Sequence, residues 1–124
     1  MKLACAVCIA LGLVAGTAHA VDADCRATSS RMLDHLDKRD YLGATADFNE
    51  RMKTSLSADR LARLWQAKMQ HLDVPGTRDS VQVGNVKGYA VVMTPLHHGH
   101  DQLNTRLVCD GDDKIGGFFV KSIS

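Results

Sequence analysis

Three histidines and an aspartate fall within five positions of the chain, in the stretch HHGHD: His97, His98, His100 and Asp101. Imidazole nitrogens suit zinc, copper and nickel, and a carboxylate can act as a fourth ligand or orient a histidine. Geometry argues against a tight site, because neighbouring residues of a strand point to opposite faces and His97 and His98 then diverge. Gly99 would allow a turn that changes this. We interpret the stretch as a polar hairpin loop, with a metal site as the alternative.

The other candidates for catalysis are isolated from one another. His35 and His71 lie beside charged residues in stretches with helical spacing, which is typical of surface groups. Nucleophilic catalysis needs a serine or cysteine next to a base, and the chain has no nucleophile-elbow motif. We therefore identify no catalytic residue and no cofactor. An enzyme that uses His71 or a loop histidine as its general base stays open as an alternative.

The acidic stretch CDGDDKIGG invites comparison with a calcium loop, but its spacing is wrong. An EF-hand loop needs glycine at its sixth position and an acid at its twelfth, and these are Ile115 and Lys121 when counted from Asp110. We predict a type I or I′ turn around Gly111 and Asp112 instead.

The first 20 residues have the pattern of a secretory signal peptide. Lys2 precedes an apolar run, and the run ends in Ala18-His19-Ala20, the small-x-small pattern that signal peptidase accepts. A membrane helix is the weaker interpretation, because the strongly apolar part fades at Gly16. We predict cleavage after Ala20, so that residues 21–124 form one domain in the periplasm or outside the cell, with no stable membrane span.

Charge and cysteine content restrict the partners and the compartment. Removal of Lys2 from the 15 basic residues balances the 14 acidic ones, and without a basic excess we expect no nucleic-acid binding. Cys25 and Cys109 remain after cleavage, and an even pair in an oxidising compartment predicts a disulfide. Its long closed loop would contribute on the order of 4 kcal/mol. Two free thiols are the alternative.

Helical spacing dominates the first half of the mature chain. TSSRMLDHLDKRD places Met32, Leu33 and Leu36 on one side, and YLGATADFNERMKTSL continues the spacing with Asp40 as an N-cap. LSADRLARLWQAKMQHLD has the clearest amphipathic stripe, with Ser57 as its N-cap and VPG at 74–76 as its end. We expect three helices.

Alternating residues in the second half predict four strands, within 79–86, 88–95, 102–110 and 114–123. The predicted joints are GN at 84, HHGHD at 97 and DGDD at 110. Helices followed by strands indicate an α+β fold, with the three helices packed on one face of a curved four-stranded antiparallel sheet. Cys109 shares a face with Leu103 and Leu107, which we expect to be the covered one.

Two stretches carry a family resemblance: LDKRDYLGATADFNERMKTSLSADRLARLWQAKM and QLNTRLVCDGDDKIGGFFV. Their order and spacing resemble the bacterial domain-of-unknown-function 3887 family from about Met32 to Val120. The residues that match are Asp40, Tyr41, Phe48, Met52, Lys53, Leu56, Leu61 and Trp65. The resemblance implies a cone-like fold of the nuclear-transport-factor-two-like (cystatin-like) group. It implies no activity, and the hairpin histidines depart from the family pattern.

Proteins of this fold often use the cone between helices and sheet, so Trp65 and Tyr89 are candidates for pocket lining; plain core is the alternative. We expect a non-catalytic accessory domain that binds a small ligand or a protein partner. The sheet is a candidate surface for a homodimer. A histidine-loop metal binder and a small pocket enzyme are the other hypotheses.

Overall fold

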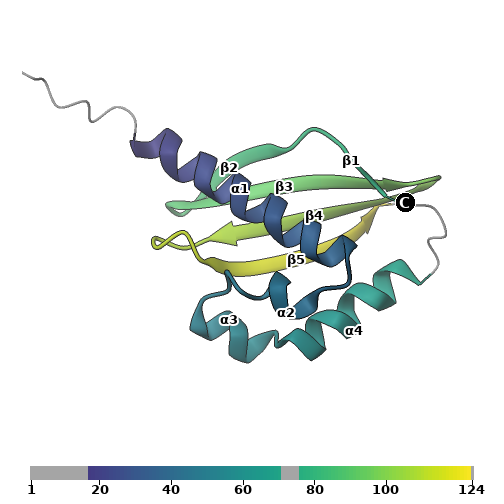
Figure 1. The fold of residues 1–124 in the computed structure, drawn as a ribbon. Helices are drawn as coiled ribbons and strands as arrows, with labels where there is room; N and C mark the ends of the chain where they lie inside the picture. The colour runs from purple at the N-terminus through teal and green to yellow at the C-terminus, as the bar shows by residue number, and fades with distance from the viewer. Residues whose placement is uncertain (1–16, 71–75, 124) are drawn as a thin grey trace, which may run out of the picture.

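The computed structural model describes residues 17–70 and 76–123, which form an α+β arrangement of helices followed by an antiparallel sheet (Figure 1). Four helices come first: α1 (Thr17–Asp37), α2 (Tyr41–Ala44), α3 (Glu50–Ser55) and α4 (Ala58–Met69). Five strands follow: β1 (Thr77–Arg78), β2 (Gln82–Val86), β3 (Tyr89–His98), β4 (Asp101–Cys109) and β5 (Ile115–Ile123). The α+β class predicted from the sequence is confirmed.

The sheet is an antiparallel meander in which β3 pairs with β4 and β4 pairs with β5. Both β1 and β2 pair with β3, at opposite ends of the same edge, so they act as one interrupted strand. The four predicted strands correspond to β2–β5, and the short β1 at Thr77 and Arg78 is a fifth strand that was not predicted. Helix α1 lies across one face of this sheet (Figure 1).

Alternation along the strands decides which side chains enter the core. Leu103, Thr105, Leu107 and Cys109 of β4 are all buried, whereas Arg106 between them is exposed. The predicted covered face of this strand is therefore confirmed. On α1, burial recurs every three to four residues, which is the stripe expected of a helix that packs with one side on a sheet. From Asp24 onward, where burial is described, the buried residues of α1 are Cys25, Thr28, Ser29, Met32, Leu33 and Leu36.

The middle helical stretch departs from the prediction, since it forms two short helices instead of one. Residues 45–49 between them leave the helical path, and Phe48 makes a parallel bridge to Ile115 of β5. The Asn49 side chain then accepts a hydrogen bond from the Met52 N–H at 2.8 Å and caps α3. Burial of Phe48 against the sheet outweighs continuation of the helix, so the expected three helices become four.

One predicted turn was also misplaced. Gly84 and Asn85 lie within β2, and the hairpin to β3 closes instead at Lys87 and Gly88, whose φ angles are 53° and 85°. Two successive positive φ angles are the signature of a type I′ turn. The side chain of Asn85 accepts a hydrogen bond from the Gly88 N–H at 3.0 Å, so the asparagine supports the turn from within the strand.

The other two hairpins turn where the sequence predicts, but the first loop is shorter than the predicted HHGHD, because His97 and His98 lie in β3 and Asp101 lies in β4. His98 pairs with Asp101, so Gly99 and His100 are the two turn residues, and Gly99 takes the positive φ of 63°. After β4, the Asp113 N–H donates to the Asp110 carbonyl at 3.1 Å around Gly111 and Asp112. Neither Gly111 nor Asp112 has a positive φ, so of the two turn types predicted here, type I and type I′, the turn is of type I.

Candidate functional site

The HHGHD stretch is divided between the two faces of the sheet and the hairpin tip. His97 points away from the helices, and its Nε2 lies 3.0 Å from Oδ2 of Asp79. His98 is on the opposite face, where its ring occupies the space that a Cβ on Gly76 would need. His100 and Asp101 are exposed at the turn. Across residues 17–70 and 76–123, no three histidine, cysteine or acidic side chains are grouped to hold a metal ion.

Two histidine–aspartate pairs stand on the surface. The pKa of Asp79 is lowered, first by the hydrogen bond with His97 and then by the Ser80 N–H. The pKa of Asp40 is also lowered, first by the Gly43 N–H and further by His35, whose Nδ1 lies 2.9 Å from Oδ2 of Asp40.

Such pairs orient an imidazole, but acid–base or nucleophilic catalysis also needs a reacting group beside the other ring nitrogen. Neither His35 nor His97 has a recorded hydrogen bond to a hydroxyl or thiol of the described residues. His71, the other base considered, lies outside the described residues. These two pairs therefore offer orientation without a catalytic partner.

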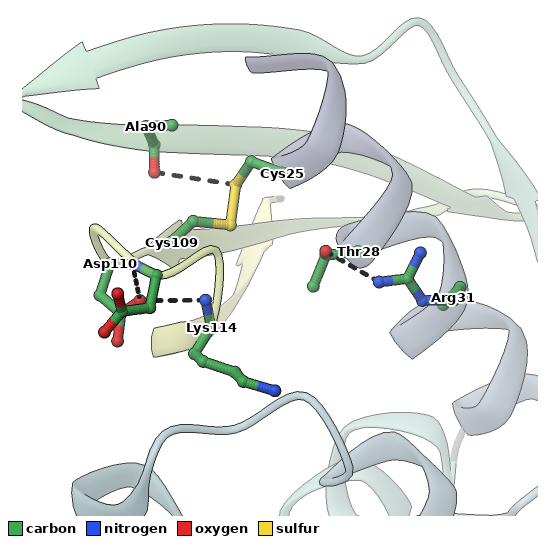
Figure 2. Close-up of a disulfide and its surroundings, with 8 residues drawn as sticks. Cys25, Thr28, Arg31, Ala90, Cys109, Asp110 and Lys114 are labelled. Atoms are coloured by element: carbon green, nitrogen blue, oxygen red, sulfur yellow. Dashed lines mark hydrogen bonds between the residues drawn. A yellow bond between two sulfur atoms is a disulfide. The ribbon is translucent and has the colours of Figure 1, made fainter. Parts of the chain in front are cut away.

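Cys25 of α1 and Cys109 of β4 are joined as a disulfide that spans 84 positions of sequence (Figure 2). Both residues are buried, at 0% and 1% exposure, so the bond belongs to the core. Sγ of Cys25 lies 3.9 Å from the carbonyl oxygen of Ala90. A disulfide sulfur carries no hydrogen, so this contact is packing. The predicted pairing agrees with the structure, and it leaves neither cysteine as a nucleophile.

Next to the disulfide, Asp110 organises the loop between β4 and β5 (Figure 2). Its Oδ1 accepts hydrogen bonds from the backbone N–H groups of Asp112 and Lys114, at 2.9 and 3.0 Å. Its Oδ2 accepts one from Nδ2 of Asn49 at 3.0 Å. Partial burial acts to raise the pKa of Asp110, but these hydrogen bonds outweigh it and the pKa is lowered. The residue is a structural anchor between loop and helix α3.

A pocket of about 210 Å³ lies between α1 and the edge of the sheet. Helix α1 contributes Arg26, Ser29, Ser30 and Leu33, and the sheet side contributes Arg78, Val81, Val92 and Thr94. Leu33, Val92, Ser29 and Thr94 are buried and form the floor, whereas Arg26 and Ser30 are exposed at the rim. No acidic residue is among the described side chains that line it.

The polar groups of this pocket differ in how far they are already satisfied. Nη2 of Arg78 donates to Asp34 and Asp37 of α1, at 2.8 and 2.9 Å, so its charge is matched by carboxylates outside the pocket. Arg26 has no recorded ion pair with any described residue.

Ser29 is 3% exposed, and no hydrogen bond from its hydroxyl to a described residue is recorded. The enclosed side-chain atoms of the described residues that lack a partner belong to Tyr41 and Asp113, and the Ser29 hydroxyl is not one of them. This hydroxyl is therefore accessible from the pocket and open to a hydrogen bond with a ligand.

Trp65 and Tyr89, the residues predicted to line a pocket, are not brought together. Trp65 on α4 is buried in the main core, and Tyr89 is half exposed on the sheet face that points away from the helices. Neither is among the described lining residues. The residues that do line the pocket come from stretches about fifty positions apart, and no spacing rule in the sequence joins them.

Comparison with protein-family models, with curated proteins and with solved structures finds no match to this chain. None of the helices that the structure describes has the length and apolar character needed to cross a membrane.

Proposed function

We propose that the protein is an exported, non-catalytic binding domain that holds a small amphipathic carboxylate in the pocket between α1 and the sheet edge. The observation that carries this proposal is the open hydroxyl of Ser29 beside an apolar floor, with Arg26 at the rim and no ion pair between Arg26 and any described residue. A carboxylate would accept from both groups, while an apolar tail would cover Leu33 and Val92.

The size of the pocket restricts the ligand. About 210 Å³ is below the roughly 300–1,000 Å³ of pockets that enclose drug-sized molecules, which favours a short-chain acid. The lining supports binding better than catalysis, because its described residues supply hydroxyls and guanidinium groups and include no histidine, cysteine or acid.

Export is part of the proposal. The signal-like residues 1–20 support it, and so does the buried disulfide, because disulfides persist mainly in oxidising compartments. The resemblance to the domain-of-unknown-function 3887 family is compatible with this role and stays a prediction.

Calorimetric titration of the disulfide-bonded protein with acetate, butyrate, hexanoate and octanoate tests the proposal, with hexanol and hexylamine as probes of matched length. We expect one intermediate chain length to bind best, and the acid to bind more tightly than its alcohol. Binding of hexanol as tight as hexanoate would show an apolar crevice without carboxylate recognition, and absence of saturable binding would refute the proposal.

Two variants locate the binding. Arg26→Ala and Ser29→Ala should each weaken binding of the best acid by about threefold to tenfold, the range of one lost hydrogen bond. Arg63→Ala removes a similarly exposed arginine from α4 and should leave the affinity unchanged. Equal losses in Arg63→Ala would place the ligand elsewhere.

A further inference from the structure

The second face of the sheet, which points away from the helices, carries an apolar row followed by rows in which apolar side chains alternate with polar or basic ones. Register places Gly84, Val91, Val108 and Gly117 in one row across β2–β5, and Met93 and Phe119 in the next row. Val91 is only 3% exposed although it does not belong to the core cluster, so its neighbours on this face enclose it. The Phe119 ring lies over Gly117, with its Cε2 3.3 Å from the position of a Cβ there.

Exposed apolar side chains gather on the same face. Five large apolar residues of the described chain are exposed, and four of them point outward from β2, β3 and β5. These four are Val86 at 44%, Tyr89 at 50%, Phe119 at 58% and Ile123 at 39%. Val86 and Tyr89 pair at one end of the face, Ile123 lies at the other end, and Phe119 lies between them beside Arg106. Four of the five exposed large apolar side chains on one face favour this face as an interaction surface.

The charge of this face has one sign. Arg106 and Lys121 are exposed on it, and none of the outward-facing residues of β2–β5 is acidic. Asp79 at the sheet edge is the carboxylate recorded beside this face, and it is bonded to His97. Among the described residues, the surface is therefore apolar and positively charged, although the 15 basic and 14 acidic residues of the whole chain nearly balance.

We propose that this face docks a protein segment that presents apolar and acidic side chains together. A second copy of the chain is a poorer fit. Docking two copies face to face would bring the Arg106 and Lys121 side chains of both copies together, with no carboxylate between them. An anionic membrane is a poorer fit as well. The apolar side chains stand on strands of a sheet, whereas insertion into a lipid surface needs an amphipathic helix or another protruding apolar element.

The test is selection of a displayed library of random linear peptides on the disulfide-bonded protein. A face variant combines Arg106→Glu, Lys121→Glu and Phe119→Ser. Its matched control combines Arg51→Glu, Arg63→Glu and Leu42→Ser. These changes reverse the same number of positive charges and remove one exposed apolar side chain on the helices, since Leu42 is 77% exposed. Lys121→Glu alone serves if the triple variant does not fold.

We expect the enriched peptides to contain apolar residues interspersed with Asp and Glu. They should bind the control variant as tightly as the wild type. Binding to the triple variant should weaken by about tenfold or more, and salt should weaken binding to the wild type. Enrichment of basic or uncharged peptides, equal binding to the face variant, or no enriched sequence would overturn the proposal.

Two further outcomes would replace the partner. Sedimentation showing a wild-type dimer that the face variant abolishes would assign this face to a second copy. Flotation with phosphatidylglycerol vesicles that requires the same residues, without any peptide enrichment, would assign it to a lipid surface.

Discussion

Asp110 makes more recorded contacts through its carboxylate than any other acid among the described residues, and it connects three parts of the fold. It holds the β4–β5 turn through two backbone N–H groups and holds the start of α3 through Asn49. It also follows Cys109 directly, so it stabilises the loop next to the disulfide. Ionised Asp110 therefore stabilises the folded state more than an ordinary surface carboxylate does.

We predict that Asp110→Ala lowers the free energy of unfolding at neutral pH by about 1–3 kcal/mol, the range for hydrogen bonds to a charged group. Asp110→Asn should lose less, because its amide oxygen still accepts. Urea unfolding measures both. Asp112→Ala, in the same turn and exposed, is the control and should stay within about 0.5 kcal/mol of the wild type. Equal effects of the two alanine variants would contradict the anchoring role.

The same residue predicts an acid response. Its pKa is lowered in the folded protein, so its stabilising contribution is complete above the ordinary value of 3.8 and is lost as the pH falls through the folded pKa. The stability gap between wild type and Asp110→Asn should therefore narrow below about pH 4. Unfolding curves at a series of acidic pH values test this, and a gap that is independent of pH would contradict it.

At the scale of elements, α4 is the most self-sufficient helix. Ser57 caps it by accepting from the Arg60 N–H, Asp59 lies in its first turn, and Lys68 lies in its last turn. Leu61 and Trp65 on one side are buried. Each of these signals is local, and for this reason the cap at Ser57 and the buried side of the helix were predicted from its own residues. The predicted end at VPG, 74–76, stays a prediction, because the helix is described to Met69 and residues 71–75 lie outside the described residues.

We predict that Ser57→Ala lowers the free energy of unfolding by about 1 kcal/mol. The Ser57 hydroxyl accepts a hydrogen bond from a first-turn N–H group that has no partner within the helix. Ser57→Asp should restore most of it, since aspartate accepts in the same way and favours the helix N-terminus. Ser55→Ala, at the end of α3, is the control and should be nearly neutral in thermal unfolding. A loss in Ser55→Ala as large as in Ser57→Ala would disprove the cap assignment.

The disulfide connects elements that are distant in sequence. Replacing Cys25 and Cys109 together with Ala should lower the free energy of unfolding by about 2–5 kcal/mol, since the denatured chain gains the freedom of a long loop. Because both cysteines are buried, glutathione should reduce the native bond far more slowly than that of the urea-unfolded protein. Thiol trapping followed by mass spectrometry measures the rate. Equal rates in both states would mean that the bond opens without unfolding.

For the whole molecule, the export hypothesis predicts the covalent form of the protein. Intact mass spectrometry of protein from an exported fraction should find a chain that begins at Val21 and has lost two hydrogens to one disulfide. Ala18→Leu should block the cut, because signal peptidase requires a small residue there. Recovery of an uncut wild-type chain would contradict the hypothesis.

What the sequence predicts depends on how local each signal is. The buried face of β4 follows from alternation at Leu103, Leu107 and Cys109, and cysteine pairing follows from there being two cysteines outside the signal-like segment. The break at residues 45–49 was missed because the helical spacing of Tyr41, Phe48 and Met52 continues through it, while the contact that ends the helix comes from Ile115.

The candidate sites were the least predictable part. Arg26 and Ser29 line the same pocket as Val92 because of the way α1 crosses the sheet. The crossing angle between a helix and a sheet cannot be predicted from local composition or spacing. The outward face of the sheet was visible as alternation in β3, but burial of Val91 on that face and the position of Phe119 over Gly117 depend on neighbouring strands.

The span of the disulfide also sets an order of events in time. Under the export hypothesis, a chain that is exported during its synthesis presents Cys25 early, while Cys109 is still 84 residues behind. At synthesis rates of about 5–20 residues per second, the first thiol waits roughly 4–17 seconds for its partner. The hypothesis then predicts that throughout that interval Cys25 is a reactive thiol in an oxidising medium, open to mixed disulfides with small thiols or with an oxidase. The buried bond of the folded protein is therefore a late product, and a thiol-exchange catalyst would have its main substrate in the half-emerged chain.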